Sequence, residues 1–90
     1  MLVRYRPAAG ALFATLTDGA VVLDVGTKKY FTLNDTGAAI WTCIRDGLGT
    51  DAMVAVLQRD YDVSEDDALT AVQVLIDALE SEQLIEPAQS

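Results

Sequence analysis

The amino-acid sequence indicates an α+β protein in which a three-stranded antiparallel sheet packs on three helices. Residues 11–33 read as short β-rich segments separated by glycine-containing turns, as is typical of antiparallel strands. From residue 35 onward the apolar residues recur at helical spacing, and signals for a helix start occur at three places. The 90 residues can bury one modest hydrophobic core, so we expect a single domain over residues 1–90.

The strands are separated by turn signals. The first strand is expected over residues 11–17, and Asp18-Gly19 then favours a tight hairpin turn into a second strand over 20–25. Residues 25–28 make another turn, and the third strand follows over 29–33, with Tyr30 and Thr32 on one face. Because the third strand is reached last in this meander, we expect it at an open edge of the sheet.

Two helices are expected directly after the third strand. Asn34 or Asp35 can cap the first helix, and its apolar stripe ends before Asp46-Gly47. Thr50 is expected to cap the second helix, which ends near Tyr61. The apolar stripes are Gly37, Ile40, Trp41 and Ile44 in the first helix, and Met53, Val56, Leu57 and Tyr61 in the second.

The third helix has the clearest start signal, because Ser64 can cap it and three acids follow in its first turn. It is expected to run to Glu82. Leu84-Ile85 then forms a short apolar tail, Pro87 stops any continuation, and the last residues should fray. The core stripe of this helix comprises Ala68, Leu69, Val72, Leu75, Ile76 and Leu79.

A second, narrower line of small or apolar residues runs beside that core stripe. Its members are Asp67, Ala71, Val74, Ala78 and Ser81. Next to an open strand edge, such a line would form a groove with backbone groups on one wall and shallow apolar pockets on the other. The alternative is that Val74 and Ala78 simply widen the contact with the core.

Charge is distributed unevenly along the chain. Residues 1–34 carry four basic and two acidic side chains, a balance of +2, whereas residues 35–90 carry two basic and twelve acidic ones, a balance of −10. This distribution argues against binding to nucleic acid or to an anionic membrane, since both need clustered Lys and Arg. The acidic part suits a basic or neutral partner, or serves only as a solvated surface.

No residues form a recognisable catalytic or metal-binding set. The chain has no histidine, Cys43 is its only cysteine, and Asp46-Gly47-Leu48-Gly49 lacks the lysine of a phosphate-binding loop. We therefore expect no enzyme activity, no metal and no cofactor. Cys43 is read as a small buried apolar residue, with a reactive thiol as the alternative. Neither a signal peptide nor a membrane span is apparent, so a cytoplasmic location is expected.

The order and spacing of several short motifs resemble the PqqD family of small peptide-binding proteins. The resemblance covers about residues 12 to 86 and includes "LDVGTKKYF", "LN" followed by a glycine and "IW", and "YDVSEDDALTAVQVLIDALESEQLI". The matching positions are Leu23-Asp24, Gly26, Tyr30-Phe31, Leu33-Asn34, Gly37, Ile40-Trp41, Gly47, Tyr61-Asp62-Val63, and Leu79 through Leu84-Ile85.

This resemblance implies a winged-helix-like domain that recognises the leader segment of a ribosomally synthesised precursor peptide. In that family the leader adds as an antiparallel strand to the third strand and lies against the third helix. Carried onto this chain, the strand is residues 28–33. The implied peptide-binding residues are Lys28, Lys29, Tyr30, Phe31, Thr32, Leu33, Asp67, Ala71, Val74 and Ala78.

The charges at this site predict a leader peptide that carries both acidic and basic residues. Lys28 and Lys29 either discourage unwanted strand pairing or attract acidic residues of the leader, whereas the acids of the third helix favour Lys or Arg. The resemblance also implies a partner enzyme that modifies the peptide, either a leader protease with a cyclase or a radical enzyme.

Several functions remain as alternatives. A lasso-peptide or similar pathway is favoured over PqqD proper in pyrroloquinoline quinone biosynthesis. A structural subunit docked on a larger enzyme is a further alternative. A DNA-binding winged helix is disfavoured, because only Arg45 and Arg59 are basic in the helical part.

Overall fold

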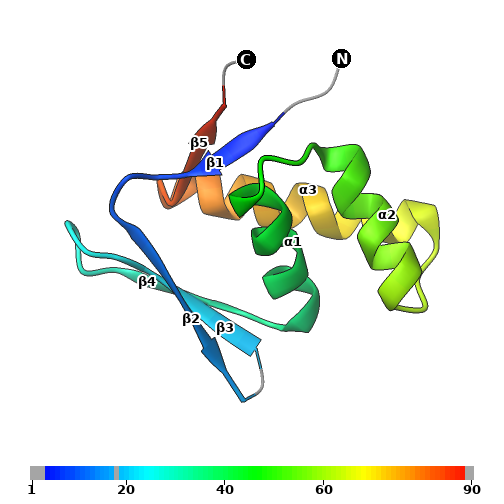
Figure 1. Cartoon of the computed structure of the whole chain (residues 1–90), viewed down its shortest axis with the longest axis horizontal. Coiled ribbons are helices and arrows are strands. Elements are labelled where there is room, and N and C mark those ends of the chain that lie inside the picture. The colour runs from blue at the N-terminus through cyan, green and yellow to red at the C-terminus, as the bar shows by residue number, and fades with distance from the viewer. Residues whose placement is uncertain (1–3, 18, 89–90) are drawn as a thin grey trace.

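The computed structural model describes residues 4–17 and 19–88, which form two small sheets and three helices (Figure 1). The elements are β1 (Tyr5–Pro7), β2 (Ala11–Leu16), β3 (Gly19–Asp24), β4 (Tyr30–Leu33), α1 (Asp35–Arg45), α2 (Thr50–Asp60), α3 (Glu65–Ser81) and β5 (Ile85–Pro87). The expected α+β architecture, a three-stranded antiparallel sheet with three helices, is confirmed.

The three-stranded sheet has the order β2-β3-β4, so β4 is an edge strand as expected. Both pairings are antiparallel, and Phe13, Val22 and Phe31 lie opposite one another across the three strands. Gly19 opens β3 with a φ of 142°, and a Cβ there would collide with the carbonyl oxygen of Leu33. Asp18, the other residue of the expected hairpin turn, lies outside the described residues.

The turn between β3 and β4 is held by one carboxylate. Asp24 accepts hydrogen bonds from the backbone N–H groups of Gly26 and Thr27, at 2.8 and 3.1 Å. Lys28 then adopts a φ of 65°, which a strand residue does not. The expected strand over residues 28–33 is therefore too long at its start, because Lys28 and Lys29 connect the turn to β4, which begins at Tyr30.

Helix capping agrees with the sequence at two of three starts. The side chain of Asn34 accepts from the N–H of Gly37 at the start of α1, and that of Ser64 accepts from the N–H of Asp67 at the start of α3. Thr50 was the wrong cap, because Gly49 occupies the N-cap of α2 and makes no side-chain bond there. Helix α3 ends at Ser81, with Glu82 as its C-cap.

The expected apolar tail at Leu84-Ile85 leads into a strand, and of the last residues, which were expected to fray, 89–90 lie outside the described part of the chain. Strand β5 pairs antiparallel with β1, joining the two ends of the chain in a separate two-stranded sheet beside α3 (Figure 1). Leu84 and Ile85 are buried, so the tail contributes to the core. Neither strand was expected, because each has only three residues and contains a proline.

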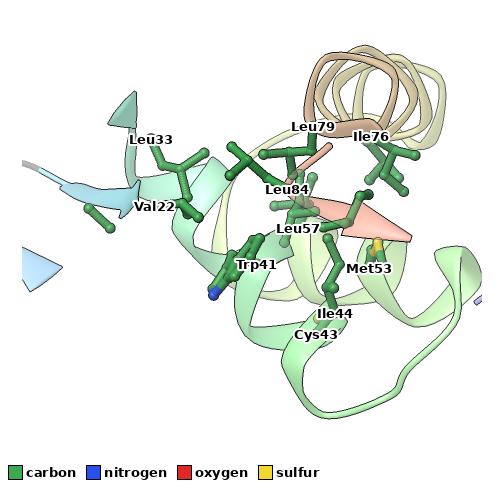
Figure 2. Packing of buried hydrophobic residues seen from close by; sticks show 14 of the residues in the cluster. Val22, Leu33, Trp41, Cys43, Ile44, Met53, Leu57, Ile76, Leu79 and Leu84 are labelled. Carbon is green, nitrogen blue, oxygen red and sulfur yellow. The ribbon is translucent and has the colours of Figure 1, made fainter. Parts of the chain in front are cut away.

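The core lies where the three helices meet the inner face of the sheet, and Figure 2 shows Trp41 at its centre between Val22, Leu33 and Leu57. All four residues of the expected α1 stripe are buried. In α3, Ala68, Val72, Ile76 and Leu79 are buried. Leu69 was wrongly assigned to the core, since 53% of it is exposed: it lies at the margin of the stripe, where no element covers α3.

Candidate functional site

A groove of about 600 Å³ lies between the open edge of β4 and helix α3. Its lining comes from three elements: the edge strand, the start of α1 and the middle of α3. The lining residues are Phe31, Thr32, Leu33, Asn34, Thr36, Gly37, Ile40, Ala71, Val74, Leu75 and Ala78. Six of the ten expected site residues are in this set.

The strand wall offers backbone groups as well as side chains. Asp24 donates its N–H to the carbonyl of Lys29, so these two residues form a hydrogen-bonded pair at the end of the ladder. Because bonded and non-bonded pairs alternate in an antiparallel ladder, we expect the N–H and C=O groups of Tyr30 and Thr32 to point toward the open edge. These groups can accept a further strand.

The helix wall is apolar and open. Val74 has 64% of its surface exposed, and Ala71 is also exposed, while Ala78 and Leu75 are half-buried. These exposures decide against the alternative that Val74 only widens the core contact. The expected groove beside α3 is therefore present, with shallow side chains on its helical wall.

The floor of the groove was not expected from the sequence. Gly37 and Ile40 are buried members of the α1 stripe that the helical spacing did reveal, but only the turn at Asn34 brings them beneath β4. The amide oxygen of Asn34 accepts from the N–H of Gly37 and the hydroxyl of Thr36, at 2.8 and 3.0 Å. This cap fixes the direction in which α1 leaves the strand.

Four expected site residues do not line the groove. Lys28 and Lys29 are exposed between the turn and β4, Tyr30 is 71% exposed, and Asp67 lies exposed in the first turn of α3. The two lysines form no ion pair with any described residue. They can therefore act on a ligand only from beyond the end of the strand.

The described residues offer little for chemistry. Cys43 is buried, and that burial, followed by the charge of Asp46, raises the pKa of its thiol. Burial also raises the pKa of Tyr5 on β1, with smaller contributions from Glu80 and Asp77 of α3. Within residues 4–17 and 19–88, no three His, Cys, Asp or Glu side chains form a group that could hold a metal ion.

No helix in the described part of the chain is long and apolar enough to cross a bilayer. The site is a groove along an unpaired strand edge, and its lining is uncharged and mostly apolar. Such an arrangement can hold an extended peptide through backbone hydrogen bonds and alternate side chains.

Comparison with known proteins gives matches of two kinds. Residues 19–85 match the model of the family described as coenzyme PQQ synthesis protein D (PqqD). Among curated proteins, none shows significant sequence similarity to the chain.

Two solved structures share the fold. A lasso peptide synthetase B1 complexed with the leader peptide is 27% identical, with a TM-score of 0.84 over 93% of this chain and 99% of that chain. TbiB1 in complex with the TbiA(beta) leader peptide is 22% identical, with a TM-score of 0.83 over 94% of this chain and 99% of that chain. The expected fold class is confirmed by both.

Proposed function

The chain belongs to the PqqD family, and on that basis we propose that its groove binds the leader segment of a ribosomally synthesised precursor peptide. The leader adds as an antiparallel strand to β4 and packs its inward side chains against α3. The protein thereby presents the precursor to the enzymes that modify it.

One observation carries this proposal: a mostly apolar groove follows the unpaired edge of β4. Strand addition uses backbone hydrogen bonds for affinity and register, and pockets for alternate side chains for selectivity. The strand wall supplies Phe31, Thr32 and Leu33, and the helix wall supplies Ala71, Val74 and Ala78. Tyr30 pairs with the peptide through its backbone groups at the start of β4. Lys28 and Lys29 contact the part of the peptide that extends past this strand, and Asp67 the part near the start of α3.

Of the possible biosynthetic pathways, we favour a lasso-peptide pathway for this protein. It is supported by the 27% identical structure, which is a lasso peptide synthetase B1 complexed with the leader peptide. The family match favours a second candidate, in which the chain serves pyrroloquinoline quinone biosynthesis.

The protein acts without catalysis of its own in this proposal. Its partner enzyme is a leader protease with a cyclase in the first pathway, and a radical enzyme in the second. The whole chain acts as one peptide-recognition domain in the cytoplasm, without metal, cofactor or nucleic acid.

A fluorescence-polarisation titration tests this proposal. The protein is titrated against labelled leader segments, which are encoded by short precursor genes beside the gene for this chain. Core segments of the same precursors serve as matched controls. Saturable binding to one leader, and not to its core, supports the proposal and identifies the pathway. If a folded protein binds none of these leaders, the docked-subunit alternative takes its place.

A further inference from the structure

The outer face of the three-stranded sheet, on the side away from the core, carries no charged residue. Across the strands, Leu12 lies opposite Leu23, which lies opposite Tyr30. The next outward row is Ala14, Val21 and Thr32, and Leu16 ends the set. We call these seven residues the outer sheet face.

This face is apolar yet open to solvent. The exposed fractions are 57% for Leu12, 51% for Leu16, 39% for Leu23 and 71% for Tyr30. An antiparallel sheet with one face on the core ordinarily shows polar residues on the other face. In a chain in which 22% of the residues are charged, seven adjacent outward positions without a charge indicate a surface that is covered in use.

We infer that the outer sheet face is the docking surface for the peptide-modifying enzyme, and that this enzyme meets it with an apolar patch bordered by Asp or Glu. The inference rests on the proposed function, because the occupant is identified by its need to reach the bound peptide. β4 takes part in both surfaces: its free edge borders the groove, and its Tyr30 and Thr32 side chains belong to the outer sheet face.

Charge supports an acidic border on the partner. Lys28 and Lys29 directly precede Tyr30, are exposed, and have no ion-pair partner among the described residues. The other charged residue at this end of β3, Asp24, uses one carboxylate oxygen on two backbone N–H groups of the turn. The border of the face nearest β4 is therefore basic, although the protein as a whole carries a charge of −8.

Size argues against a second copy of this chain as the occupant. Three strands of at most six residues, spaced about 4.8 Å apart with a rise of about 3.3 Å per residue, present a face of roughly 300 Å². A stable protein interface buries about 800 Å² on each partner. The face alone is too small to hold a lasting dimer, and suits a partner that gains further contact elsewhere, such as on the bound peptide.

The test measures two affinities separately with the full chain. The probe is the purified peptide-modifying enzyme encoded beside the gene for this chain, titrated by biolayer interferometry in the presence of precursor. Leader affinity is measured by fluorescence polarisation. The variant Leu12→Ser with Leu23→Ser removes two apolar side chains from the face. As a control, Leu69→Ser removes a leucine from α3 whose exposed fraction, 53%, lies between those of Leu12 and Leu23.

We expect the double variant to bind the enzyme at least tenfold more weakly, with leader affinity within twofold of the wild type and the Leu69→Ser control unchanged. Circular dichroism checks that each variant is folded. With enough precursor to saturate each variant, Lys28→Glu with Lys29→Glu should weaken enzyme binding most at low salt, since exposed charges are screened as salt rises. Enzyme binding equal to that of the wild type at every salt concentration overturns the acidic border.

Four results overturn the docking surface. They are unchanged enzyme affinity in the double variant, no enzyme binding by the wild type, an equal loss in the Leu69→Ser control, and a wild-type dimer that the double variant dissociates. The last result assigns the face to a second copy. A loss of leader affinity with enzyme affinity intact would instead place these leucines in the peptide site. If the wild type fails to bind any leader, the proposed function fails first, independently of the face.

Discussion

The ring of Phe13 lies stacked on the indole of Trp41, with ring centroids 6.1 Å apart and an interplanar angle of 7°. Phe13 is in the middle of β2 and Trp41 is in the middle of α1, so the pair joins the strand farthest from the groove to the helix that forms its floor. Trp41 is almost wholly buried, with 1% of its surface exposed. The pair is one of the contacts that hold the sheet on the helices.

Phe13→Leu should therefore destabilise the fold by about 1 kcal/mol, because it keeps an apolar side chain but removes the stacked ring. Urea unfolding, followed by circular dichroism, measures the change in unfolding free energy. Ala14→Ser, the next residue on the opposite face of β2, should change it by less than about 0.5 kcal/mol. Equal effects in the two variants would contradict the role given to the stacked pair.

Val74→Asp should weaken leader binding by about 1–3 kcal/mol and leave the fold intact. The reason is that 64% of Val74 is exposed in the free protein, whereas a bound peptide would bury the new charge without a partner. Fluorescence polarisation gives the affinity. Leu69→Asp adds the same charge to the same helix at an exposed position outside the groove, and should bind the leader nearly as the wild type does. Wild-type affinity in Val74→Asp would remove α3 from the site.

Thr32→Pro tests the edge of β4 directly. If the N–H of Thr32 points to the open edge, proline removes a donor that only a bound peptide uses. We expect at least a tenfold loss of leader affinity with a stability change of about 1 kcal/mol or less. Phe31→Pro should instead unfold the sheet, since its N–H is expected to pair with β3. The reverse pattern would show that the register of free and paired groups is the opposite one.

Leu84→Ala should lower the unfolding free energy by about 2–4 kcal/mol, because this residue is 98% buried next to the β1–β5 sheet. Glu86→Gln, which removes the exposed ion pair with Arg6, should cost less than about 0.5 kcal/mol. Urea unfolding compares the two variants. A small effect at Leu84 would mean that the C-terminal segment adds little to the core.

The unfolding free energy should depend on pH through the thiol of Cys43. Burial raises the pKa of its thiol in the folded protein, so the folded state holds the proton more tightly than the unfolded state does. The protonated thiol therefore contributes to the unfolding free energy. This contribution is fully present below the ordinary thiol pKa of about 8.5 and is lost as the pH rises above that value toward the raised pKa of the folded state. Cys43→Ala, which keeps Tyr5 and every other titrating group, should lose less unfolding free energy between pH 7 and pH 9.5 than the wild type. Parallel curves would contradict this assignment.

Cys43→Ser should leave leader affinity unchanged and cost about 1–3 kcal/mol of stability, because it places a hydroxyl in an apolar site. Fluorescence polarisation and urea unfolding measure the two quantities. Lost binding in a folded variant would instead support the reactive thiol.

The sequence by itself determined the order of the three strands and three helices, the edge position of β4 and two of the helix caps. These features depend on local signals: a period of two or 3.6, an Asn or Ser at a helix start, and a glycine at a turn. The spacing within α3 likewise separated the buried stripe from the line through Ala71, Val74 and Ala78, which the structure places along the groove.

Only the tertiary structure decided what depends on distant contacts. β1 and β5 are too short to show a period and form strands because the two ends of the chain meet. Leu69 has the spacing of a core residue but no element covers it, and Gly37 and Ile40 reach the groove only because α1 turns beneath β4. Periodicity shows which side of an element is apolar, whereas the packing of several elements decides which apolar sides are buried and which remain open for a partner.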